Sequence, residues 1–65
     1  MRLMEIARGL SDVQRYWLAR AQRDDGWFPA SAPIQTERAL ERRGLVAKGR
    51  LTDLGAQVDE YIAGR

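Results

Sequence analysis

The stretch TERALERRGLVAKGRLTDLG, residues 36–55, contributes most to the prediction of the fold. It holds two Glu, five basic residues and three Gly among regularly spaced apolar residues. Apolar residues at helical spacing predict a helix over 33–43, and the glycine that follows is typical of a helix end. Pro33 suits the first turn of this helix, with Ser31 or Ala32 as its N-cap.

The chain after this helix predicts a β-hairpin over 45–52 and then a last helix. Lys48-Gly49 is suited to the tight turn between two short strands. Thr52 is expected to cap a helix over about 53–63, because a threonine hydroxyl can accept a hydrogen bond from the first helical turn. The apolar stripe expected on the buried side of this helix consists of Leu54, Val58, Tyr61 and Ile62.

The first 23 residues predict helical structure that is interrupted near Gly9. One interpretation is a short helix at about 2–8 followed by a main helix at about 12–23. The other is a continuous helix that contains Gly9, at a cost of about 1 kcal/mol. Ser11 and Gln14 have the spacing of a capping box, which marks a helix start. The apolar residues expected on one side of this helical structure are Leu3, Ile6, Leu10, Val13, Trp17 and Ala21.

The connection to the helix at 33–43 is too short to hold more than one helical turn. Residues 24–26, Asp-Asp-Gly, predict a turn that ends the main helix. Trp27 and Phe28 suit a short extended piece, and Pro29 limits strand pairing there.

Composition limits the classes of function that are open to the chain. Its 65 residues predict a single domain, 1–65, in which residues 1–10 form an N-terminal arm or short helix. The sequence has no Cys and no His, which removes disulfides, thiol chemistry and nearly every zinc site. The neighbouring carboxylates at 24–25 and 59–60 are expected at exposed positions, so neither an enzyme nor a metal or cofactor site is expected.

Positive charge is concentrated in the middle of the chain. Residues 33–50 hold five basic and two acidic residues, a balance of +3, whereas residues 51–65 hold one basic and three acidic residues, a balance of −2. Such a concentration is typical of a nucleic-acid footprint. Ten of the eleven basic residues are Arg, which a GC-rich genome would also produce. The segment MRLMEIARGL is neither a signal peptide nor a membrane span, so we expect a cytoplasmic protein without membrane association.

The helix at 33–43 predicts a polar surface that is segregated by sign. Gln35, Arg38 and Arg42 share one side, while Glu37 and Glu41 lie on another. Arginine can donate two hydrogen bonds to guanine, and glutamine can donate one to adenine N7 and accept one from its amino group, so this side suits the DNA major groove. Lys48 and Arg50 in the hairpin would contact phosphates. The alternative is a solvated face on which Arg38 pairs with Glu41. In either case Arg43 is ambiguous as a DNA contact, because its side of the helix faces the edge of the core.

The segment ALERRGLVAKGRLTDLGAQV, residues 39–58, resembles the second half of bacterial winged helix-turn-helix domains of the MarR and PadR type. The match covers about a third of the chain, in two blocks: Leu40, Arg43, Gly44, Leu45 and Val46, then Leu51, Thr52 and Gly55. The resemblance implies a mainly α fold with a small β-hairpin, a compact winged helix of three main helices plus a wing. It also implies DNA binding through the helix at 33–43. Stand-alone proteins of this layout are similar to ones encoded by bacteria and bacteriophages.

The chain departs from this family in two respects. The supporting helix of a standard helix-turn-helix is missing before residue 33, where Trp27 and Phe28 would take its place in the core. The wing is short, with only Lys48-Gly49 at its tip. Both departures weaken the transfer of DNA binding, because fold alone does not determine function.

The leading hypothesis is a small DNA-binding transcriptional or recombination regulator. It uses Gln35, Arg38 and Arg42 in the groove and Lys48 and Arg50 on phosphates. A useful specificity would need a homodimer on a two-part site. The candidate dimer surfaces are the arm residues Leu3, Met4 and Ile6, and Tyr61 and Ile62 of the last helix.

The alternative hypothesis is a protein-interaction module without DNA binding, such as a phage protein that docks on a host factor. Exposed aromatic residues would anchor such a partner. Trp17, Trp27 and Phe28 would then lie at the surface, whereas the simpler interpretation places them in the core. Tyr16 lies off the apolar stripe and is expected to be exposed in either case. A structural piece of a larger assembly is a third interpretation.

Overall fold

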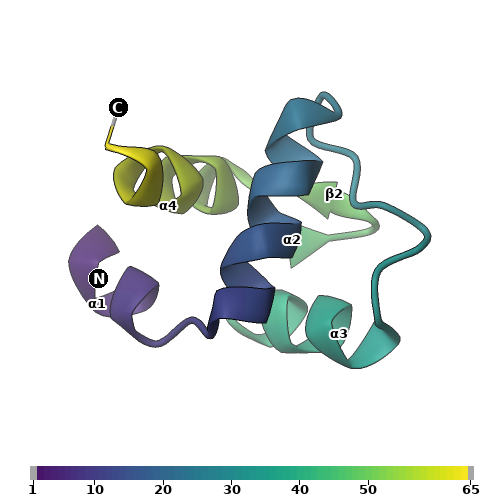
Figure 1. Ribbon diagram of the computed structural model, residues 1–65, viewed down its shortest axis with the longest axis horizontal. Helices are drawn as coiled ribbons and strands as arrows, with labels where there is room; N and C mark the ends of the chain where they lie inside the picture. Colours follow the sequence, from purple (N-terminus) through teal and green to yellow (C-terminus); the bar gives the residue numbers. More distant parts are fainter. Residues whose placement is uncertain (1, 65) are drawn as a thin grey trace.

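Four helices and a two-stranded antiparallel hairpin make up the computed structural model, which describes residues 2–64 (Figure 1). In chain order the elements are α1 (Leu3–Arg8), α2 (Asp12–Arg23), α3 (Ile34–Arg42), β1 (Val46–Ala47), β2 (Arg50–Leu51) and α4 (Asp53–Ala63). The hairpin pairs Val46 with Leu51 and Ala47 with Arg50. The expected fold class, mainly α with a small β-hairpin, is therefore confirmed.

The break near Gly9 separates α1 from α2, so the continuous-helix interpretation is wrong. Gly9 ends α1, and the capping box at Ser11 starts α2. The Gln14 N–H donates to the Ser11 hydroxyl at 3.1 Å, and the Ser11 N–H donates to the Gln14 side-chain oxygen at 2.9 Å. These reciprocal bonds satisfy two backbone donors that the first turn of a helix otherwise leaves unpaired.

Loss of the α2 cap gives the first testable prediction. Ser11→Ala should lower the free energy of unfolding by about 1 kcal/mol, because the Gln14 N–H loses its acceptor. Urea denaturation followed by circular dichroism measures this change. Ser31→Ala is the matched control, since Ser31 is exposed in a loop and should change stability by less than about 0.5 kcal/mol. Equal effects of the two substitutions would contradict the capping role.

The core lies where α2, α3, α4 and the hairpin meet, and α1 closes it by packing against α4 (Figure 1). Each helix and β1 bring at least one side chain to this cluster, and Leu51 of β2 packs against it. The cluster excludes water from apolar surface and so stabilises the fold. The fully buried members are Leu18, Leu40, Leu45, Val46 and Val58.

Two members of the expected apolar stripes are exposed. Val13 of α2 is 54% exposed, whereas Leu18, which lies outside the expected stripe, is completely buried. The stripe was wrong because α1 and α2 are separate helices and do not share one helical phase. Tyr61 of α4 is 46% exposed, at the edge of the stripe that buries Val58.

The connection between α2 and α3 is an extended piece followed by a single turn. Trp27 forms an isolated antiparallel bridge with Arg50, so this segment borders the β2 side of the hairpin. A turn closed by the Ala32 N–H and the Pro29 carbonyl follows. Pro33 is itself the N-cap of α3, without a side-chain cap bond. The expected caps at residues 31 and 32 are therefore wrong, because the helix begins one residue later than predicted.

The end of α3, the hairpin and the start of α4 are held together at Thr52. Its hydroxyl accepts a bond from the Gly55 N–H at 3.0 Å and donates to the Gly44 carbonyl at 2.6 Å. Its N–H donates to the Leu45 carbonyl at 3.0 Å. Gly44 has a φ of 77°, a left-handed conformation that glycine adopts without strain. Thr52 therefore caps α4, as predicted, and it also ties the start of α4 to Gly44, just after the end of α3.

Candidate functional site

The outward face of α3 forms an open depression of about 620 Å³ lined by Gln35, Arg38, Glu41 and Arg42. All four side chains are exposed, while Leu40 on the opposite side of the helix is completely buried. Three of the five residues predicted to bind DNA, Gln35, Arg38 and Arg42, are therefore gathered on one surface. Within residues 2–64 the two arginines have neither an ion-pair partner nor a side-chain hydrogen bond, so both guanidinium groups keep their donors.

The predicted segregation of charge on this helix is wrong. Glu41 lies in the same depression as Arg38 and Arg42, while Glu37 is half-buried at the side of the helix. Residues 38 and 41 are three apart and so share a face. The expected pairing of Arg38 with Glu41 does not occur among the described residues. The face carries two positive charges and one negative charge.

Ile34 is an exposed residue beside this face that the sequence patterns missed, although it does not line the depression. Its side chain is 58% exposed at the first residue of α3. Residues 34, 38 and 42 are spaced by four and therefore follow one another along the same side of a helix. Helical phase could have identified Ile34, because at 3.6 residues per turn it lies well away from the side of α3 that buries Leu40.

The hairpin residues Lys48 and Arg50 lie outside this depression. Lys48 is exposed at the hairpin turn with a φ of 54°. The Arg50 guanidinium stacks over the Trp27 ring, 4.3 Å from its centroid, and donates to the Asp25 carbonyl at 3.0 Å. Lys48 therefore presents a free ammonium group in the described part of the chain, whereas Arg50 is already held by two contacts.

The tip of the hairpin is fixed to the connection between α2 and α3. The Phe28 N–H donates to the Gly49 carbonyl at 2.8 Å, and the Leu51 N–H donates to the Gly26 carbonyl at 2.7 Å. Phe28 is buried, as the core interpretation predicts, but Trp27 is 51% exposed. Its predicted place in the core is therefore wrong, because neighbouring residues of an extended piece point to opposite sides.

Several other arginines have structural contacts. Arg43 donates to the Gly9 carbonyl at 3.0 Å, which ties the end of α3 to the α1–α2 junction. Arg15 donates to the Ala7 carbonyl at 3.0 Å, and Arg20 donates to the Tyr16 hydroxyl at 2.9 Å. Tyr16 itself is about half exposed, as expected. Arg38 and Arg42 have no such contact among the described residues, and they share one face of α3, whereas Arg8 and Arg23, which are also exposed and without such a contact, lie on separate helices.

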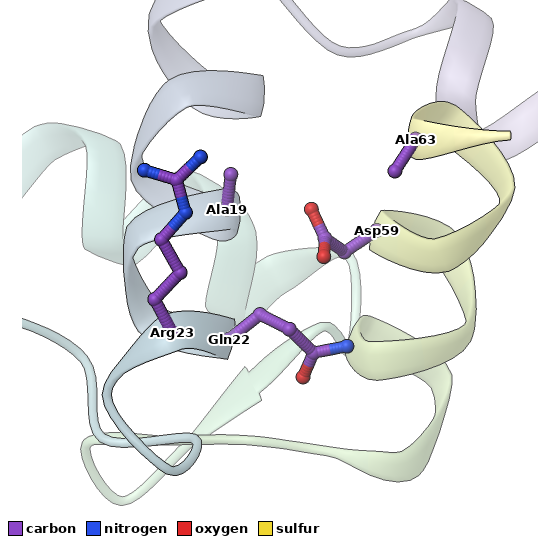
Figure 2. A pocket seen from close by; sticks show the side chains of 5 residues that line it. All are labelled: Ala19, Gln22, Arg23, Asp59 and Ala63. Carbon is purple, nitrogen blue, oxygen red and sulfur yellow. The ribbon is translucent and has the colours of Figure 1, made fainter. Parts of the chain in front are cut away.

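A second cleft, of about 450 Å³, lies between α2 and α4. Figure 2 shows the Asp59 carboxylate pointing from α4 toward α2, where Ala19 lies opposite. Gln22 reaches across from α2, and its side-chain amide donates to the Ala56 carbonyl at 3.4 Å. Asp59 is only 4% exposed, so the prediction that it lies on an exposed side is wrong. Burial on the side of α4 that faces α2 is the reason.

Only part of the predicted dimer surface on the arm and the last helix is exposed. Ile6 is buried in the core, and Leu3 and Ile62 are half-buried against it. Met4 and Tyr61 remain exposed and line a groove of about 420 Å³ between α1 and α4.

Comparison with known proteins gave no match to a family model, a curated protein or a solved structure. The described helices, with a two-stranded antiparallel hairpin between α3 and α4, are consistent in shape with a winged-helix-like protein. Within residues 2–64, each helix is too short or too polar to cross a membrane.

Proposed function

We propose that this protein is a small winged-helix DNA-binding protein that places α3 in the major groove and the hairpin beside the phosphate backbone. The observation that carries the proposal is the pair Arg38 and Arg42, exposed on one face of α3 and without a partner in residues 2–64. Two like charges one turn apart repel each other on an isolated helix. An anionic ligand replaces this repulsion with attraction.

The side chains of this face match the chemistry of base edges. Arg38 can donate to guanine O6 and N7, and Gln35 can form the analogous pair of bonds with adenine. Glu41 on the same face can accept a hydrogen bond from the amino group of cytosine. Arg42 and Lys48 would neutralise phosphates, which provides affinity without sequence information. Arg50 contributes positive charge while it remains stacked on Trp27.

A second candidate function is a protein-interaction module. The observation in its favour is that Tyr16, Trp27 and Tyr61 are each about half exposed. Large aromatic side chains at a surface are the usual anchors of protein interfaces. A module of this kind would bind its partner without the arginines of α3, so the same substitutions distinguish the two functions.

Salt-dependent binding to random-sequence duplex DNA tests the proposal. Wild-type affinity should fall steeply as salt rises, because bound cations are released from the DNA when phosphates are neutralised. Arg38→Ala/Arg42→Ala should weaken binding and lower the slope of log affinity against log salt by up to about 2. Fluorescence anisotropy gives the affinities, and circular dichroism verifies that the double variant is folded.

The control removes the same amount of charge elsewhere. Arg8→Ala/Arg23→Ala replaces two exposed arginines of α1 and α2, and it should retain most of the binding. If wild type does not bind at about 50 mM salt, where electrostatic binding is strong, the DNA-binding function is wrong. If both double variants lose binding equally, net charge rather than the α3 face accounts for it.

A further inference from the structure

Ile34 is the most exposed of the large apolar side chains in the described chain. It does not belong to the core cluster or to the apolar residues that pack against it. Helix stability does not account for it either, because β-branched residues have lower helix propensity than many alternatives. Its side chain is therefore available for a contact outside the chain.

The place of Ile34 on α3 specifies the kind of contact. In helix-turn-helix proteins the N-terminal residues of the recognition helix contact base edges, while phosphates are contacted elsewhere. Ile34 and Gln35 are the first two residues of α3. Arg38 follows Ile34 one turn later on the same side. The N-terminal turn thus combines a short apolar side chain with an amide that suits adenine.

We infer that Ile34 contacts the C5-methyl group of thymine in the major groove, so that the first turn of α3 recognises an A·T base pair. This inference rests on the proposed DNA-binding function. Thymine is the standard DNA base that carries a methyl group in the major groove, and apolar side chains recognise it there. Gln35, the next residue, can bind the adenine of this or a neighbouring base pair.

Duplexes that differ only in this methyl group test the inference. The probes are alternating dA-dT and alternating dA-dU duplexes of equal length, which present the same hydrogen-bonding groups. Because every base pair of the first duplex carries the methyl group, the test does not depend on register. Wild-type protein should bind the dA-dT duplex about fourfold more tightly, the factor expected for burial of one methyl group. Fluorescence anisotropy at a single salt concentration gives the ratio.

Two variants assign the difference to Ile34. Ile34→Ala should bring the ratio close to one, and because the position is exposed the variant should remain folded. Val13→Ala is the matched control, since Val13 is also β-branched and 54% exposed but lies on α2, and it should keep the wild-type ratio. If the ratio persists in Ile34→Ala, duplex shape causes it and the inference is overturned.

The outcomes separate this inference from the proposed function. Equal binding of wild type to both duplexes overturns the methyl contact and leaves DNA binding intact. Lack of binding to either duplex, under the low-salt condition described above, overturns both. A ratio that depends on Ile34 supports both and identifies the first turn of α3 as the base-reading end of the helix.

Discussion

Gly55→Ala should be among the most destabilising single substitutions in this protein, lowering the free energy of unfolding by about 3 kcal/mol. A Cβ atom at residue 55 would overlap the backbone carbonyl of Leu45. Backbone cannot move aside as a side-chain end can, so α4 would have to shift away from the hairpin. A domain of this size is stable by roughly 3–10 kcal/mol, so much of its stability would be lost.

Urea denaturation of the variant measures the loss. Gly9→Ala is the matched control, because a Cβ there would meet the Arg43 guanidinium, which is the flexible end of a side chain. Gly9 has a φ of −78°, which alanine also adopts, so the control should change stability by less than about 1 kcal/mol. A Gly55→Ala protein as stable as the control would show that α4 does not need its close approach to the hairpin.

Leu40→Ala should destabilise the protein by about 2–5 kcal/mol, the range for removing a buried leucine side chain. Leu40 is completely buried and is the only residue of α3 in the core. The cavity would lie beneath the helix that carries Arg38 and Arg42. The substitution should therefore loosen the attachment of α3 as well as lower overall stability.

Thermal or urea unfolding measures the Leu40→Ala effect, and Ile34→Ala on the same helix is the control. Both substitutions remove aliphatic carbons, but Ile34 is 58% exposed, so its replacement should cost less than about 0.5 kcal/mol. Similar losses of stability in the two variants would contradict the burial of Leu40 and the exposure of Ile34.

Local signals account for the parts of the fold that the sequence predicts well. Ser11 with Gln14 marks the start of α2, and Thr52 marks the start of α4, because each cap depends on residues three positions apart. Lys48-Gly49 forms the hairpin turn with positive φ at both residues, as a tight hairpin requires. These features are decided within one or two turns of chain, which a single sequence contains in full.

The errors concern how separate elements pack. Val13 is exposed and Leu18, which the expected stripe omits, is buried, because the phase of α2 depends on the break at Gly9. Trp27 is exposed because Phe28 takes the inward position of a two-residue extended piece. Asp59 is buried because its side of α4 faces α2, a relation between residues far apart in the sequence.

The grouping of residues on α3 was predicted in part, while their role in binding stays a prediction. Gln35, Arg38 and Arg42 follow from helical spacing alone, and they do line one depression. Glu41 lies with them rather than on a separate side, a position that the three-residue spacing from Arg38 also allows. The contacts of Arg50 with Trp27 and Asp25 could not be predicted, since they join the hairpin to a turn 25 residues earlier.

The two backbone hydrogen bonds that fix the hairpin tip, from Phe28 to Gly49 and from Leu51 to Gly26, have a consequence for the energetics of recognition. A flexible wing loses conformational entropy when a ligand orders it, and that loss is subtracted from the binding free energy. Here the hairpin backbone is already ordered before a ligand arrives. At the hairpin tip, only the Lys48 side chain would have to give up its rotational freedom.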